Sequence, residues 1–133
     1  MQIQVNIGDP KNGKTYKKTI AEDDAKIFFG KKIGDNLKGE LVQAPGYEFA
    51  IAGGSDYCGF PMRADVEGTL RKRILITSGI GLRPTRDGRR VRKAVAGNTV
   101  YTRTAQLNLK ITKYGSQPLE APAQQEAPAA SEE

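Results

Sequence analysis

The amino-acid sequence contains no histidine and only one cysteine, Cys58. The absence of histidine excludes Ser-His and Cys-His nucleophile pairs and every zinc site that uses an imidazole ligand. A single cysteine can form neither an internal disulfide nor a cysteine-rich metal site, so we interpret Cys58 as a structural thiol. We therefore expect no catalytic residue, no metal site and no cofactor.

Long hydrophobic runs are also missing from the sequence. No apolar stretch approaches the roughly 20 residues that a membrane-spanning helix needs, and the N-terminus lacks the apolar core of a signal peptide. The length of 133 residues suits one folded domain. We expect a soluble, cytoplasmic protein with no membrane partner and no small-molecule substrate.

Acidic residues are scarce in one part of the chain. Residues 63–93 contain ten Lys or Arg and three Asp or Glu, whereas the other residues carry eleven basic and twelve acidic groups. A clustered basic surface attracts polyanions and raises their local concentration. A solvated face kept basic for solubility is the alternative, but the clustering favours a nucleic-acid partner.

One segment matches the phosphate-loop pattern G-x-x-x-x-G-K-[ST]. Gly8 to Thr15 satisfies it and follows a predicted strand. A working phosphate loop must lead into a helix, because the helix N-terminus holds the phosphates. The residues that follow, 16–20, alternate in polarity as a strand does. We interpret the segment as a hairpin turn; a nucleotide-hydrolysing enzyme is the alternative.

The remaining pattern predicts a mainly β fold. Short strands are expected at residues 1–7, 15–20, 40–43, 47–52, 70–77 and 98–112. One helix is expected at residues 22–32, with acidic residues in its first turn, lysines in its last and Gly34 after its end. The fifteen glycines suggest tight corners, so we predict a small antiparallel β-barrel-like domain with one short helix.

The composition changes at residue 116. Residues 116–133 contain three prolines, five alanines and four glutamates, without Lys or Arg. Such a segment buries too little apolar surface to offset its ordering entropy. We predict a β-barrel-like RNA-binding domain at residues 1–115 and a disordered acidic C-terminal tail at residues 116–133, which solubilises the chain or shields its basic surface.

The functional hypothesis rests on the basic run that ends at Lys93. Asp87-Gly88 indicates a turn, so the arginines around it project from a loop and from the start of the next strand. Arginine suits two-point phosphate contacts, and the absence of aromatic residues argues against a base-stacking platform. Charge alone does not distinguish RNA from DNA, and a hairpin tip without a partner is the alternative. The residues predicted to bind RNA are Arg71, Lys72, Arg73, Arg83, Arg86, Arg89, Arg90, Arg92 and Lys93.

The segment GGSDYCGFPM, residues 53–62, resembles the signature of one family. It is the small-subunit ribosomal protein numbered six in the archaeal and eukaryotic series, called S-six-e. The basic loop, the segment VAGNTV at residues 95–100 and LNLK at residues 107–110 are similar to that family too. The resemblance covers about residues 1–114. It is the reason that we expect RNA rather than DNA as the nucleic-acid partner.

This resemblance implies a non-enzymatic, β-barrel-like protein bound to the RNA of the small ribosomal subunit, beside neighbouring ribosomal proteins. Within the signature, Asp56 is expected to close a turn and residues 60–62 to fill the core beneath it. Eukaryotic members continue into a long basic extension with regulated serines, whereas this chain ends in an acidic segment. We therefore expect an archaeal short form without that phosphorylation control. A free RNA-binding factor or RNA chaperone is the rival function.

Overall fold

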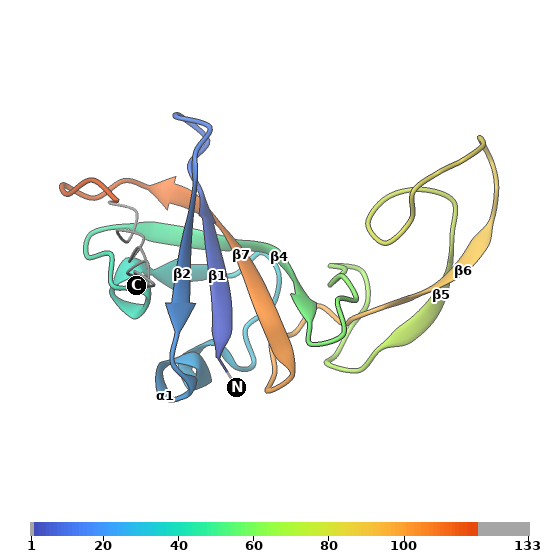
Figure 1. The fold of residues 1–133 in the computed structure, drawn as a ribbon, viewed down its shortest axis with the longest axis horizontal. Coiled ribbons are helices and arrows are strands. Elements are labelled where there is room, and N and C mark those ends of the chain that lie inside the picture. The colour runs from blue at the N-terminus through green and yellow to red at the C-terminus, as the bar shows by residue number, and fades with distance from the viewer. Residues whose placement is uncertain (1, 120–133) are drawn as a thin grey trace, which may run out of the picture.

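The strands form one five-stranded sheet and a separate two-stranded ribbon in the computed structural model, which describes residues 2–119. The sheet has the strand order β2-β1-β7-β4-β3, and the ribbon pairs β5 with β6 (Figure 1). The elements in chain order are β1 (Ile3–Gly8), β2 (Thr15–Ile20), α1 (Glu22–Ala25), the 3-10 turn η1 (Lys26–Phe28), β3 (Asn36–Lys38), the 3-10 turn η2 (Gly39–Val42), β4 (Glu48–Asp56), β5 (Lys72–Ile76), β6 (Val91–Val95) and β7 (Thr104–Lys113).

The predicted fold class, mainly β with one short helix, is confirmed. The barrel description holds only loosely, because β2 and β3 are the two edges of the sheet and do not pair with each other in residues 2–119. The sheet is also not wholly antiparallel, since β1 runs parallel to β7. These two strands come from opposite ends of the domain, so the long connection that a parallel pair requires is available.

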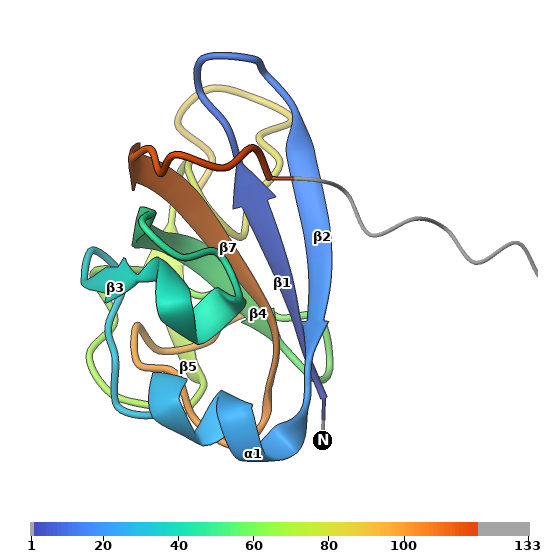
Figure 2. The ribbon, with the colours of Figure 1, turned by 90° about the vertical axis from the view of Figure 1, so that its left-hand side faces the viewer.

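The core lies on one face of the five-stranded sheet. Alternate residues of β1, β4 and β7 point into it, and α1, η1 and η2 lie over the same face (Figure 2). Phe28 of η1 and Val42 of η2 are fully buried there. The alternating apolar residues of the sequence therefore lie on the inward faces of β1 and β7. The buried strand residues include Ile3, Val5, Ile7, Phe49, Ile51, Leu107, Leu109 and Ile111.

The phosphate-loop pattern folds as the predicted hairpin turn. The chain leads into β2, which pairs with β1, and not into a helix. Asp9 closes the turn: its Oδ1 accepts hydrogen bonds from the amides of Lys11 (2.9 Å) and Asn12 (3.4 Å) and from the hydroxyl of Tyr114 (2.6 Å). The Asp9 carboxylate therefore already accepts hydrogen bonds from two of the loop amides that a bound phosphate would need.

We expect this hairpin to lose stability in acid. The hydrogen bond from Tyr114, followed by those from the loop, holds the pKa of Asp9 below its ordinary value of 3.8. A carboxyl whose pKa is lowered by folding stabilises the fold above its unfolded-state pKa, and this contribution disappears as the pH falls through the folded value. Thermal unfolding at about pH 7 and about pH 2.5 should show a smaller acid-induced drop for Asp9→Asn than for the parent chain. Equal drops would contradict this role of Asp9.

The predicted helix is shorter than its apolar pattern suggested. It begins at residue 22 as expected, but α1 and η1 together end at Phe28. The amides of Gly30 and Ile33 donate to the carbonyl oxygens of Val100 and Asn98, instead of continuing a helical ladder. Hydrogen bonding to a distant loop therefore overrides the local periodicity.

No helix in residues 2–119 is long and apolar enough to cross a membrane.

Two predicted strands were placed wrongly. Residues 40–43 form most of η2 and the residue after it, where Gln43 has a φ of 56°. Residues 98–103 are irregular, and the long last strand begins only at Thr104. Both segments contain β-branched or apolar residues, which favour strands, but the chain turns there. Propensity for strands depends on such surroundings.

The predicted boundary at residue 116 stays a prediction. Residues 116–119 are described and contact the domain: the hydroxyl of Tyr47 donates to the carbonyl of Gln117, and Leu119 packs against the core. The rest of the predicted tail, residues 120–133, lies outside the described residues.

Candidate nucleic-acid interface

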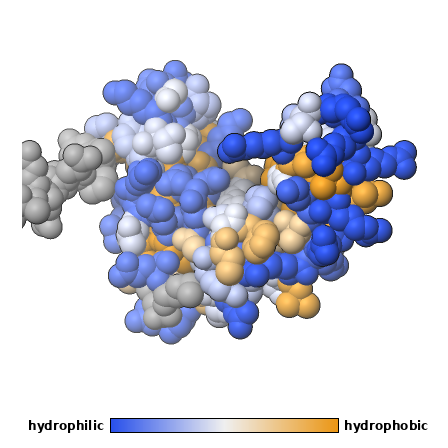
Figure 3. Space-filling view, turned by 45° about the vertical axis from the view of Figure 1, so that its right-hand side comes forward, coloured by the Kyte–Doolittle hydropathy of each residue, from blue (hydrophilic) through white to orange (hydrophobic). Residues whose placement is uncertain are grey.

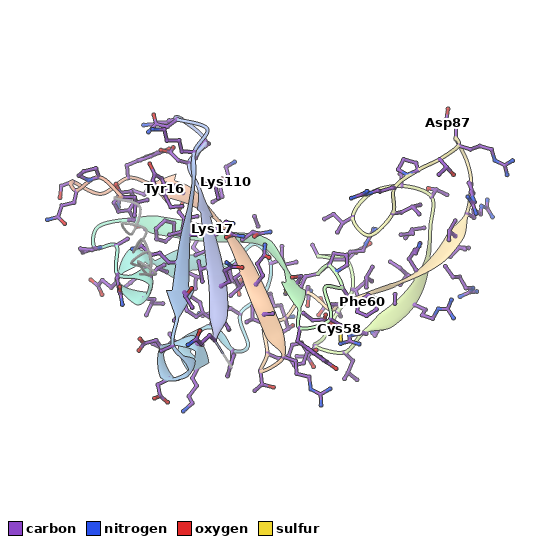
Figure 4. The ribbon with its side chains drawn as sticks, viewed as in Figure 1. Tyr16, Lys17, Cys58, Phe60, Asp87 and Lys110 are labelled. Carbon is purple, nitrogen blue, oxygen red and sulfur yellow. The ribbon has the colours of Figure 1, made fainter. Side chains whose placement is uncertain are left out.

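A basic arm, residues 70–95, projects from the five-stranded sheet (Figure 1). It consists of β5, β6 and the loop of residues 77–90 that joins them. The arm carries nine Lys or Arg and one acidic residue, Asp87, which lies at its tip (Figure 4). The basic excess found in the sequence is thus gathered on one projecting element, which contains all nine residues predicted to bind RNA.

A tight turn after β4 forms the base of the arm. The buried carboxylate of Asp56 accepts hydrogen bonds through Oδ1 from the amides of Cys58 (2.9 Å) and Phe60 (3.1 Å). Gly59 within this turn has a φ of 83°, which glycine adopts without a steric penalty. Met62 is buried in the core below. The expected roles of Asp56 and of Met62 in the signature segment are confirmed, whereas Phe60 and Pro61, which were also expected to fill the core, are only half-buried.

Arg71 joins this turn to the arm. Its Nε donates a hydrogen bond to Oδ2 of Asp56, and its guanidinium lies 4.8 Å and 4.9 Å from the ring centroids of Phe60 and Tyr57. The hydrogen bond to Asp56 is the main cause that holds the pKa of Arg71 above its ordinary value. Only 31% of the Arg71 side chain is exposed, so we assign it chiefly to holding the arm in place. Contact between Arg71 and RNA stays a prediction.

Arg63 holds the loop of the arm against its base. Its Nη1 donates to the carbonyl of Ile80 (2.9 Å), while Nε and Nη2 form a two-point pair with the carboxylate of Asp65 (both 2.8 Å). The hydrogen bond to Asp65 is the main cause of the raised pKa of Arg63. This role could not be predicted from local sequence, because the bond to Ile80 spans 17 residues.

The other eight predicted residues are all exposed, but they do not share one face. The register of the ribbon places Arg73 and Arg92 on one face and Lys72 and Lys93 on the other. Beyond the ribbon, Arg83, Arg86, Arg89 and Arg90 belong to the loop. The structure therefore brings the predicted cations onto one element, distributed over both of its faces and its end.

Two hollows in the arm are lined by arginine. Arg83, Arg86 and Arg89 line the smaller one with Thr85, whose hydroxyl Oγ1 accepts a hydrogen bond from Arg89 Nη1 (3.1 Å). Arg90 lines the other, of about 290 Å³, together with Arg63 and residues of β5. No acidic residue lines either hollow among the described residues. The larger hollow therefore presents the positive charge of two arginines to an anion.

The arm also exposes aliphatic side chains. Leu70, Leu75 and Ile80 are 73%, 54% and 55% exposed, and Figure 3 shows hydrophobic residues among the hydrophilic ones of the arm. Leu75 lies on the same face of the ribbon as Arg73 and Arg92. Apolar groups gathered on a projecting element are typical of a surface that a partner covers.

Comparison with known proteins assigns the chain to a family. The family described as ribosomal protein S6e matches residues 3–124. The small ribosomal subunit protein eS6 of Archaeoglobus fulgidus is 43% identical over 121 residues, which cover 90% of this chain and 94% of that protein. The eS6 protein of Picrophilus torridus is 44% identical over 119 residues, covering 90% and 93% of the two chains. The resemblance of the signature segment is thus confirmed, and this chain belongs to the ribosomal protein S6e family.

Proposed function

We propose that this chain is a structural constituent of the small ribosomal subunit and binds ribosomal RNA through the basic arm. The main support for this proposal is the composition of the arm, because nine basic residues and one acidic residue lie on this single projecting element. Family membership and the names of the relatives, which are small ribosomal subunit proteins, support this setting. The protein would then work in the cytoplasm, on the ribosome, and no catalytic step is needed.

The arm would bind the RNA backbone rather than the bases. Arginine forms two-point contacts with phosphate, and residues 70–95 contain no aromatic side chain on which a base could stack. Cations on both faces and at the end of a narrow ribbon suit a position between RNA segments, where phosphates approach from several directions. By neutralising these phosphates the arm would stabilise the local fold of the RNA.

The exposed aliphatic groups suggest what else meets the arm. Leu70, Leu75 and Ile80 offer no charge or hydrogen bond to a phosphate, so we assign them to contacts with sugars or with neighbouring ribosomal proteins. Arg71 would contribute chiefly by holding the arm in its orientation on Asp56. A fixed arm loses less conformational entropy when it binds than a flexible loop does.

Sedimentation of cell lysate tests the ribosomal assignment. We expect the chain to co-migrate with small subunits after a wash at moderate salt, and a variant with Arg83, Arg86 and Arg89 replaced by glutamine to be released. A free RNA-binding factor or RNA chaperone would instead stay near the top of the gradient. That result for the parent chain would contradict a structural role in the subunit.

A further inference from the structure

The face of the five-stranded sheet that points away from the core has an unusual composition. We call it the outer face. Side chains that are paired across neighbouring strands lie side by side on this face and form rows. The three central rows are Thr19, Gln4, Gln106 and Ser55; Lys17, Asn6, Asn108 and Gly53; and Thr15, Gly8, Lys110, Ala50 and Asn36.

These rows contain two lysines and no Asp or Glu. Lys17 of β2 and Lys110 of β7 are both exposed, and neither forms an ion pair with another described residue. Figure 4 shows both on the upper part of the sheet, while Cys58 and Phe60 lie at the base of the arm. The rows also lack aromatic residues and large aliphatic ones, so they suit neither base stacking nor an apolar protein surface.

Amide side chains occupy the centre of the outer face. Oδ1 of Asn108 accepts hydrogen bonds from Nδ2 of Asn6 (3.2 Å) and from Nε2 of Gln106 (3.0 Å). This network holds three amides across β1 and β7, and the amide nitrogen of Asn108 has no partner among the described residues. A fixed amide can both donate and accept, as a ribose 2′-hydroxyl can.

Gly53 is a glycine that the fold itself does not require. Its φ is not positive, although a register shift lies beside it, and an added Cβ would meet no atom within 4 Å. The neighbouring Gly54 differs, because its Cβ would lie 2.3 Å from the carbonyl oxygen of Gln106. Glycine inside a strand weakens it and often marks a place where another molecule comes close. No atom of the described residues fills the space beside Gly53, so a molecule that comes close there is external to them.

We propose that the outer face binds the minor groove of an A-form RNA duplex, a second contact that rests on the ribosomal RNA binding proposed for the arm. The minor groove of A-form RNA is wide and shallow and displays 2′-hydroxyls between two lines of phosphates. The centre of the face, with Gly53 and the amides of Asn6, Gln106 and Asn108, meets the riboses. Lys17 and Lys110 meet the phosphates.

The position of the outer face agrees with this contact. The short helices α1, η1 and η2 cover the opposite face of the sheet, and the arm projects on the side of the outer face (Figures 1 and 2). One folded RNA can therefore reach both surfaces. This face could not be predicted from the sequence, because its residues come from five strands and only the pairing of the strands brings them together.

Hydroxyl-radical footprinting of the full chain on small-subunit ribosomal RNA tests the proposal, since the radical reports exposure of riboses. Gly53→Val, with a strand-forming side chain, should remove the protection of one duplex segment and weaken binding by about tenfold, as expected for one or two lost hydrogen bonds. Lys17→Gln with Lys110→Gln should expose the same segment and lower the salt slope of log affinity by about 1.5.

The arm variants and a steric control separate the two proposals. Ala21→Val, at an exposed position before α1, should leave the footprint unchanged. Arginine-to-glutamine variants of the arm should expose other riboses than Gly53→Val does. If Gly53→Val folds, as circular dichroism would show, and keeps the complete footprint, the outer-face contact is wrong while RNA binding by the arm stands. Equal affinity for a DNA duplex of the same sequence would also contradict the minor-groove contact.

Discussion

Replacing Arg83, Arg86 and Arg89 with glutamine is expected to weaken binding to small-subunit ribosomal RNA by about 100-fold near 0.15 M salt. The three side chains are exposed at one end of the arm, and they line a common hollow whose lining contains no acidic residue among the described residues. Each phosphate contact releases condensed counterions, which contributes roughly 0.7–0.9 to the slope of log affinity against log salt. The slope should therefore fall by about 2–3 in the triple variant.

A matched variant controls for net charge. Lys26, Lys31 and Lys32 are exposed lysines outside the arm, so their replacement by glutamine removes the same charge from another surface. Long-range attraction alone would weaken RNA binding equally in both triple variants. The local contact requires a several-fold larger loss in the arm variant. Equal affinities and equal salt slopes for the two triple variants, measured by filter binding, would show that the arm has no special role.

Asp56→Ala is expected to lower the free energy of unfolding by about 2–4 kcal/mol. The buried carboxylate is the acceptor for the amides of Cys58 and Phe60 and for Nε of Arg71. Alanine leaves these donors without their partner, and the guanidinium of Arg71 keeps its charge beside the rings of Phe60 and Tyr57. A change of this size is a large part of the stability of an ordinary domain.

Urea unfolding measures this loss, and hydrogen exchange locates it. The exchange of amides in residues 70–95 should speed up more than that of β1 and β7, because Asp56 holds the base of the arm. Asp87→Ala at the exposed tip is the matched control and should leave the unfolding midpoint nearly unchanged. An unaltered midpoint for Asp56→Ala would show that the turn is stabilised by other interactions.

The parts of the fold that depend on local sequence were predictable. Alternation marked the buried faces of β1 and of the second half of the last strand, and Asp9 with Gly13 marked the first hairpin. The signature segment identified the family and the turn at Asp56. In each case the interactions that decide the structure lie within a few residues of one another.

The parts that depend on distant contacts were not predictable. Bonds to the loop at residues 98–100 end the helix early, and the parallel pairing of β1 with β7 joins strands about 100 residues apart. Arg71 looked like its basic neighbours in the sequence, but its partner Asp56 lies 15 residues earlier. The charge cluster predicted a basic surface correctly, whereas the division of its members between two faces follows from the pairing of β5 with β6.

Chemical crosslinking of protein to RNA in assembled small subunits, with mass spectrometry of the peptides that carry nucleotides, most directly tests whether the basic arm contacts ribosomal RNA. We expect nucleotide adducts on peptides from residues 71–73 and 83–93, and their absence from peptides of α1 and η2. Adducts confined to the rest of the chain, with the arm unmodified in intact subunits, would contradict RNA binding by the arm.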